Sequence, residues 1–175
     1  GGTMAEVKNA VSHIERGQLG QRITVDMNGD FESLKNSINK SLDNIQNVFE
    51  ELESKLHKMR EGVFDTEDNF QTHGVYQDII DATDDTEVAI KSALDEILRV
   101  IQSMEDGDFK QRIQGDMKGE FKLLKNNVNL SLDEIDEALT EITDTLTKTS
   151  KGDLSARVER TMVGQLNVLA QSLNE

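Results

Sequence analysis

The chain has 175 residues, a formal net charge of −15, and no proline, cysteine or tryptophan. Charged residues make up 30% and aromatic residues 4%, a composition typical of long amphipathic helices rather than of one thick globular core. The acidity argues against a nucleic-acid partner, because a phosphate backbone needs a basic face. No apolar run approaches the ~20 residues of a transmembrane helix, so we expect no direct membrane insertion and a cytoplasmic location.

The chain contains a repeat of 45 residues, marked by two ladders of glycine. The first ladder is Gly17, Gly62, Gly107 and Gly152, and the second is Gly29, Gly74, Gly119 and Gly164. We divide the chain into four repeats, at residues 4–47, 48–92, 93–137 and 138–175, the fourth truncated. Residues 11–45 are identical to residues 101–135 at 17 of 35 positions, but to residues 56–90 at only 3. Repeat two is therefore the divergent copy.

The first predicted helix ends near Gly17, because glycine favours the left-handed conformation that stops a helix. A connector of about 13 residues follows, far longer than the ~2–5 residues of a simple antiparallel turn. At roughly 3.3 Å per residue it can run back along the helix and start a second helix parallel to the first. Its apolar residues Leu19 and Ile23 are expected to anchor it in a groove of a helical bundle.

A long helix is predicted after Gly29. Apolar residues fall at steps of three or four from Phe31 to Met59, a single helical stripe about 30 residues long. A helix with so narrow a stripe cannot bury it alone, so the pattern predicts pairing with other copies. Asp30 stands where this helix begins and Glu120 at the equivalent place in repeat three, where a carboxylate stabilises the helix N-terminus.

Repeat two keeps both glycines and has the apolar Phe64 at the place of Leu19, but the apolar stripe of its long helix is changed. Thr83 and Glu87 stand where repeat one has Ile38 and Leu42, and Asp68 takes the place of the second anchor. A Glu at a dimer axis would meet its own symmetry mate, and a buried like-charge pair is costly. We expect this helix to rotate so that Glu87 reaches water, which gives repeat two a packing different from repeats one and three.

Repeats three and four return to the first pattern. Their predicted anchors are Phe109 with Ile113, and Leu154 with Val158. Two parallel helices per chain in each repeat, dimerised into tandem four-helix bundles, fit these spacings best. The predicted fold is all-α, a coiled-coil-like homodimer.

The residues 107–113 (GDFKQRI) and 119–129 (GEFKLLKNNVN) resemble the HAMP domain, the linker module of chemoreceptors, sensor histidine kinases and some adenylyl cyclases. Residues 17–23, 29–39 and 152–158 carry the same resemblance, and repeat two carries it more weakly. The combination is most similar to poly-HAMP chemoreceptors. The resemblance implies a homodimeric four-helix bundle placed between sensor and output domains of a parent chain. It also implies that the carboxylates of Asp30 and Glu120 tie the second helix to the end of the first and take part in switching.

Chemistry other than signalling finds little support. The three histidines are scattered and there is no cysteine, so no metal site or cofactor is expected. Asp84, Asp85 and Glu87 lack the alternating ligands and glycine turn of a calcium loop, and are interpreted as a solvated helix face. No enzyme is expected. Two functions remain, a signal relay with two bundle packings of similar energy, and a passive spacer or dimerisation rod. The divergence of repeat two favours the relay.

Overall fold

The computed structural model describes residues 2–64 and 69–175, in which the regular secondary structure is all α-helix, with no strand. Five helices follow one another: α1 (Gly2–Glu15), α2 (Asp30–Arg60), α3 (Val75–Glu105), α4 (Gly119–Ser150) and α5 (Gly164–Asn174). The prediction of an all-α chain is confirmed. The length of α2 and α4, 31 and 32 residues, matches the stripes in the sequence.

Each of the first four helices ends in the same hydrogen-bonded turn, with a glycine just past its last residues. At the end of α2, the Gly62 amide donates to the Met59 carbonyl and the Val63 amide to the Lys58 carbonyl, each at 2.9 Å. Gly62 has φ +78°, and the other three glycines of this ladder also have positive φ. An L-residue with a Cβ would be strained there. The glycine ladder therefore sets where each connector leaves the helix.

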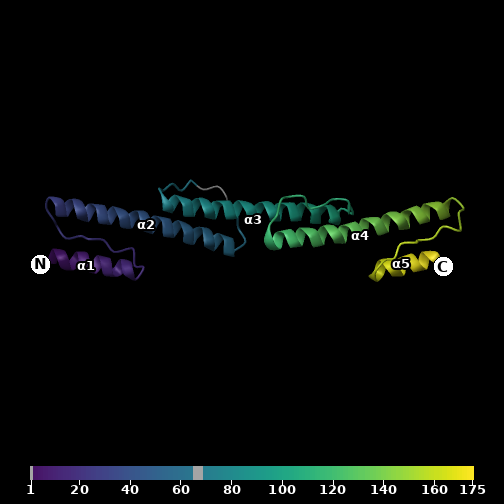
Figure 1. The fold of residues 1–175 in the computed structure, drawn as a ribbon, viewed down its shortest axis with the longest axis horizontal. Coiled ribbons are helices and arrows are strands. Elements are labelled where there is room, and N and C mark those ends of the chain that lie inside the picture. The colour runs from purple at the N-terminus through teal and green to yellow at the C-terminus, as the bar shows by residue number, and fades with distance from the viewer. Residues whose placement is uncertain (1, 65–68) are drawn as a thin grey trace. The chain divides into compact units, whose positions relative to one another are not determined.

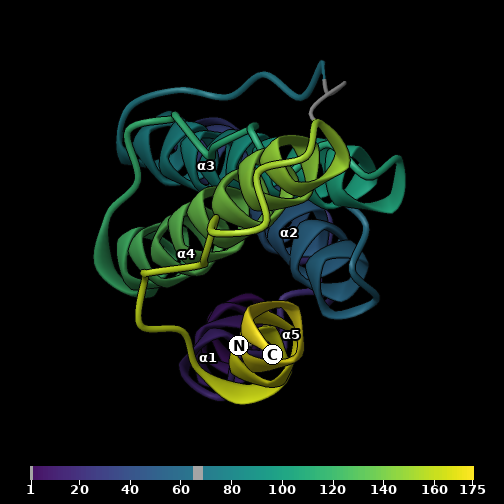
Figure 2. The same cartoon turned by 90° about the vertical axis from the view of Figure 1, so that its right-hand side faces the viewer.

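The chain forms two compact halves, residues 1–91 and residues 92–175. In the first half α1 runs parallel to the start of α2, and the end of α2 runs parallel to the start of α3 (Figure 1). The connectors between α1 and α2, between α3 and α4 and between α4 and α5 are extended and run back along the helices, and the turned view shows the last of them in yellow (Figure 2).

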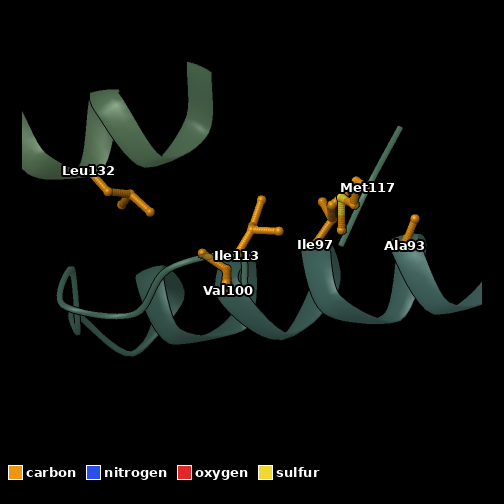
Figure 3. Packing of buried hydrophobic residues seen from close by; sticks show 6 residues of the cluster. All are labelled: Ala93, Ile97, Val100, Ile113, Met117 and Leu132. Carbon is orange, nitrogen blue, oxygen red and sulfur yellow. The ribbon is translucent and has the colours of Figure 1, made fainter. Parts of the chain in front are cut away.

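The core of each repeat lies between two helices and the connector that joins them. In repeat three it contains Ala93, Ile97 and Val100 of α3, Ile113 and Met117 of the connector, and Leu132 of α4 (Figure 3). Burying side chains of this size contributes roughly 1.5–3 kcal/mol each. In repeat four the cluster is built from Ala138, Ile142, Val158, Met162 and Ala170. The connector is therefore part of the core and not a free loop.

None of the described helices combines the length and apolarity that crossing a membrane would require.

Candidate functional site: the connectors and the core of repeat two

In repeats one, three and four the connector is anchored by a buried aliphatic residue. Ile23, Ile113 and Val158 are 2%, 1% and 6% exposed. Asp68, the residue of repeat two at this place, lies outside the described residues. The first anchors are less buried: Leu19, Phe64 and Phe109 are half-buried.

Leu154 does not act as an anchor, since it is 75% exposed. Its prediction as a packed residue was wrong for this structure. In repeat four the connector is buried instead at Val158 and Met162.

An asparagine on the second helix clamps the backbone of the buried anchor. The Ile113 amide donates to Oδ1 of Asn129, and Nδ2 of Asn129 donates back to the Ile113 carbonyl, both at 2.9 Å. Asn39 bonds Ile23 in the same way, and Asn174 bonds Val158. A buried extended backbone has no ladder partner, so the amide supplies both of its missing hydrogen bonds.

A glutamate on the first helix holds the connector from the other side. Glu96 accepts a hydrogen bond from the Gln114 amide at 3.0 Å, and Glu6 and Glu141 accept equivalent bonds from residues 24–25 and 159–160. The Arg99 guanidinium and the Gln114 amide lower the pKa of Glu96 to about 2. For Glu6 the pKa is also lowered, chiefly by the Thr24 amide. The charged form is therefore favoured at Glu96 by Arg99 and by the connector amide of Gln114, and at Glu6 by the connector amide of Thr24.

An arginine before each anchor completes the attachment in repeats one and three. Arg22 pairs with Asp43 across 2.7 Å and donates to the Leu19 carbonyl. Arg112 does the same with Asp133 at 2.8 Å and with the Phe109 carbonyl. Repeats one and three, which resemble each other in sequence, therefore share their connector contacts as well.

Sequence reasoning missed the asparagine, glutamate and arginine of these contacts. All three recur with the period of 45 residues: Glu6, Glu51, Glu96 and Glu141 are invariant, and Asn39, Asn129 and Asn174 are interrupted only by Asp84. That period was the available signal. Apolar and glycine positions alone do not reveal these polar ladders.

Repeat two has a charged core where the other repeats have an apolar one. Glu87 is 0% exposed and Lys55 3% exposed. The ammonium Nζ of Lys55 lies 2.8 Å from Asp84 Oδ1 and 3.7 Å from Glu87 Oε2, with Glu51 of the same helix at 3.8 Å. The ion pairs join α2 to α3 within the first half of the chain.

Two predictions about this region were wrong. Glu87 does not rotate to water, and it is not part of a solvated face, whereas Asp85 is exposed and the Asp84 side chain is 38% exposed. Glu87 keeps the buried register of Leu42 and Leu132, which are 2% and 1% exposed. The cost of burying the carboxylate is offset by a cation on the neighbouring helix, a partner that the stripe of α3 alone could not reveal.

The remaining predicted residues lie at the surface or near it. Thr83 is half-buried and its hydroxyl donates to the Ile79 carbonyl, one turn earlier. Asp30 and Glu120 are exposed at the first turns of α2 and α4. In the described part of the chain neither carboxylate ties the helix to the end of the preceding one, so their place fits the charge stabilisation of a helix N-terminus.

No group of His, Cys, Asp or Glu in residues 2–64 and 69–175 is arranged to hold a metal ion. The contacts described above position the helices and the connectors relative to one another.

The comparisons with known proteins agree with this architecture. The family model of the HAMP domain matches residues 2–47, 71–137 and 128–175, most of the chain. The chain belongs to the HAMP domain family. HAMP domains are signal-relay modules of sensor proteins, and the matched segments form a tandem array here. No solved structure matches the chain.

Proposed function

We propose that this HAMP array relays a conformational signal between a sensor domain and a chemoreceptor- or kinase-type output domain, as a parallel homodimer in the cytoplasm and without catalysis of its own. One observation carries the proposal. The three long helices each serve two consecutive repeats, and each leaves an apolar stripe uncovered.

The uncovered stripe supports the homodimer. On α2, Phe31, Leu34, Phe49 and Leu56 are 51–60% exposed, while Leu42 and Val48 are buried against the connector side. Phe49 and Leu56 stand seven residues apart, the spacing of a coiled-coil seam. On α4, the counterparts of Leu34 and Leu56 are Leu124 and Leu146, which are 43% and 49% exposed. A second copy in parallel register would cover each stripe with its own equivalent.

The continuity of the helices supports the relay. The start of α2 packs in repeat one and its end packs in repeat two, with no break over 31 residues. A rigid helix that is turned or shifted at one end transfers the motion to the other, because packed interfaces change between discrete arrangements rather than deform gradually. A spacer would need the same helices but no response to changes in its core.

The experiment places the chain between a receptor input domain and a kinase-controlling output domain and varies the core of repeat three. Ile97→Ala and Leu132→Ala remove buried volume, and Ser131→Ala is the control on an exposed face of α4. A relay predicts a shifted output in the first two variants while sedimentation still shows the dimer. Unchanged output in a still-dimeric protein would contradict the relay and leave the spacer.

A further inference from the structure

The core of repeat two differs from its neighbours at two positions that face each other. Counting in steps of 45 residues, Lys55 corresponds to Ala10, Val100 and Thr145, and all four are at most 5% exposed. Glu87 corresponds to Leu42 and Leu132, which are equally buried. The facing positions therefore hold Ala10 with Leu42, Lys55 with Glu87, and Val100 with Leu132.

From this juxtaposition we infer that Lys55 and Glu87 form a pairing code that directs the end of α2 to the start of α3 and to no other helix of the array. A code is needed because repeats one and three are similar enough to exchange partners. Their apolar pairs would fit one another, whether within one chain or between two chains that swap helices.

The charges make every wrong pairing costly. Lys55 placed against Leu42 or Leu132 would lose the carboxylates of Asp84 and Glu87 and keep only Glu51 of its own helix. Glu87 placed against Ala10 or Val100 would leave a buried carboxylate without a cation. Removing one partner of a buried ion pair destabilises a protein much more than replacing both by apolar residues. A single polar pair in a helical core can therefore select one partner and one register, at some cost in stability.

The geometry excludes the simpler interpretation, that Lys55 lies at the surface and extends its ammonium into water. Its side chain is 4% exposed and Nζ is directed at Asp84 and Glu87 of α3. Among the described residues, neither oxygen of Glu87 accepts a hydrogen bond. The ion pair with Lys55 is thus the compensation that the described structure provides for this carboxylate. The code concerns which helices pair, and it stands whether or not the array relays a signal.

The test exchanges residues between repeats two and three in the full chain, so that all variants keep the same composition and charge. One half-exchange is Lys55→Val with Val100→Lys, and the other is Glu87→Leu with Leu132→Glu. Each leaves a charged residue facing an apolar one in both repeats. The full exchange combines all four changes, which restores an apolar pair in repeat two and moves the ion pair to repeat three.

We expect each half-exchange to lower the melting temperature on the order of 10 °C, the scale of breaking one buried ion pair and burying a second charge without its partner in a chain of this size. The full exchange should recover at least half of that loss, although Asn129 replaces the Asp84 partner there. Hydrogen exchange should quicken around residues 55, 87, 100 and 132 in the half-exchanges and slow again in the full exchange. Half-exchanges as stable as the natural chain would overturn the code, and so would a full exchange that melts as low as they do or fails to fold.

Discussion

At the scale of single residues, the difference between an amide and a carboxylate separates repeat two from the others. Asn39, Asn129 and Asn174 both accept from and donate to the connector backbone. Asp84 stands at the same place in repeat two, and an ionised carboxylate cannot donate. Its oxygen instead meets Lys55. One substitution thus changes a neutral clamp on the connector into part of a charged contact between helices.

Asn129→Asp should destabilise repeat three by about 1–3 kcal/mol, the cost of leaving a buried hydrogen-bonding group unsatisfied. The variant keeps the acceptor for the Ile113 amide but removes the donor to the Ile113 carbonyl. Thermal unfolding measures the loss. Asn126→Asp, on an exposed face of the same helix, adds the same charge and should change the melting temperature little. Equal melting of the two variants would show that the clamp contributes nothing.

The connector carboxylates predict a response to acid. The pKa of Glu96 is lowered from 4.5 to about 2 in the folded chain. A group whose pKa is lower when folded stabilises the fold above its unfolded pKa, and the contribution is lost as the pH falls from 4.5 towards 2. Glu96→Gln should therefore reduce the slope of stability against pH in this window. Glu105→Gln, at the exposed end of α3, is the control, and equal slopes in the two variants would contradict the assignment.

At the scale of elements, the connectors are extended segments fixed by side chains from two helices. The sequence predicted their length, direction and buried second anchors, since glycine ladders and apolar spacing carry that information. It did not predict the polar clamps, because hydrogen bonds such as that of Asn129 to Ile113 join residues 16 apart through the fold. Nor could it place Glu87, since its burial depends on Lys55, 32 residues earlier on another helix.

Ile113→Asp and Leu154→Asp test how unevenly the anchors contribute. Ile113 is 1% exposed, so the change should cost at least the ~2–5 kcal/mol of a large-to-small core substitution, plus the burial of a charge. Leu154 is 75% exposed and should tolerate aspartate within about 0.5 kcal/mol. Denaturant unfolding distinguishes them. Similar losses in both variants would mean that Leu154 is covered in solution, as a partner chain could do.

At the scale of the whole molecule, the buried and exposed apolar residues of one helix serve different purposes. Leu42 and Val48 close the core within one chain, whereas Phe49 and Leu56 are left for contacts outside it. A single chain with so many exposed apolar side chains is expected to associate, because uncovered apolar patches promote association. The charged pair of Lys55 and Glu87 has a different role in the pairing inferred above, which is to select the helix that packs against the end of α2.

The dimer is tested by placing charge on the outward stripe of α2. Phe49→Asp with Leu56→Asp should leave the internal core intact, since both side chains are 59% exposed in the single chain. In a dimer, however, four carboxylates would meet at the seam and repel one another. The dimer would also lose roughly 1.5–3 kcal/mol of apolar burial for each residue replaced. Sedimentation equilibrium should show the natural chain at twice 19.6 kDa and the variant as monomer. The control, Asn47→Asp with Ser54→Asp, adds the same charge with the same spacing at exposed polar positions and should remain a dimer. A natural chain that sediments as a monomer would remove the basis for the homodimer. A variant as dimeric as the control would place the interface on another face of the helices.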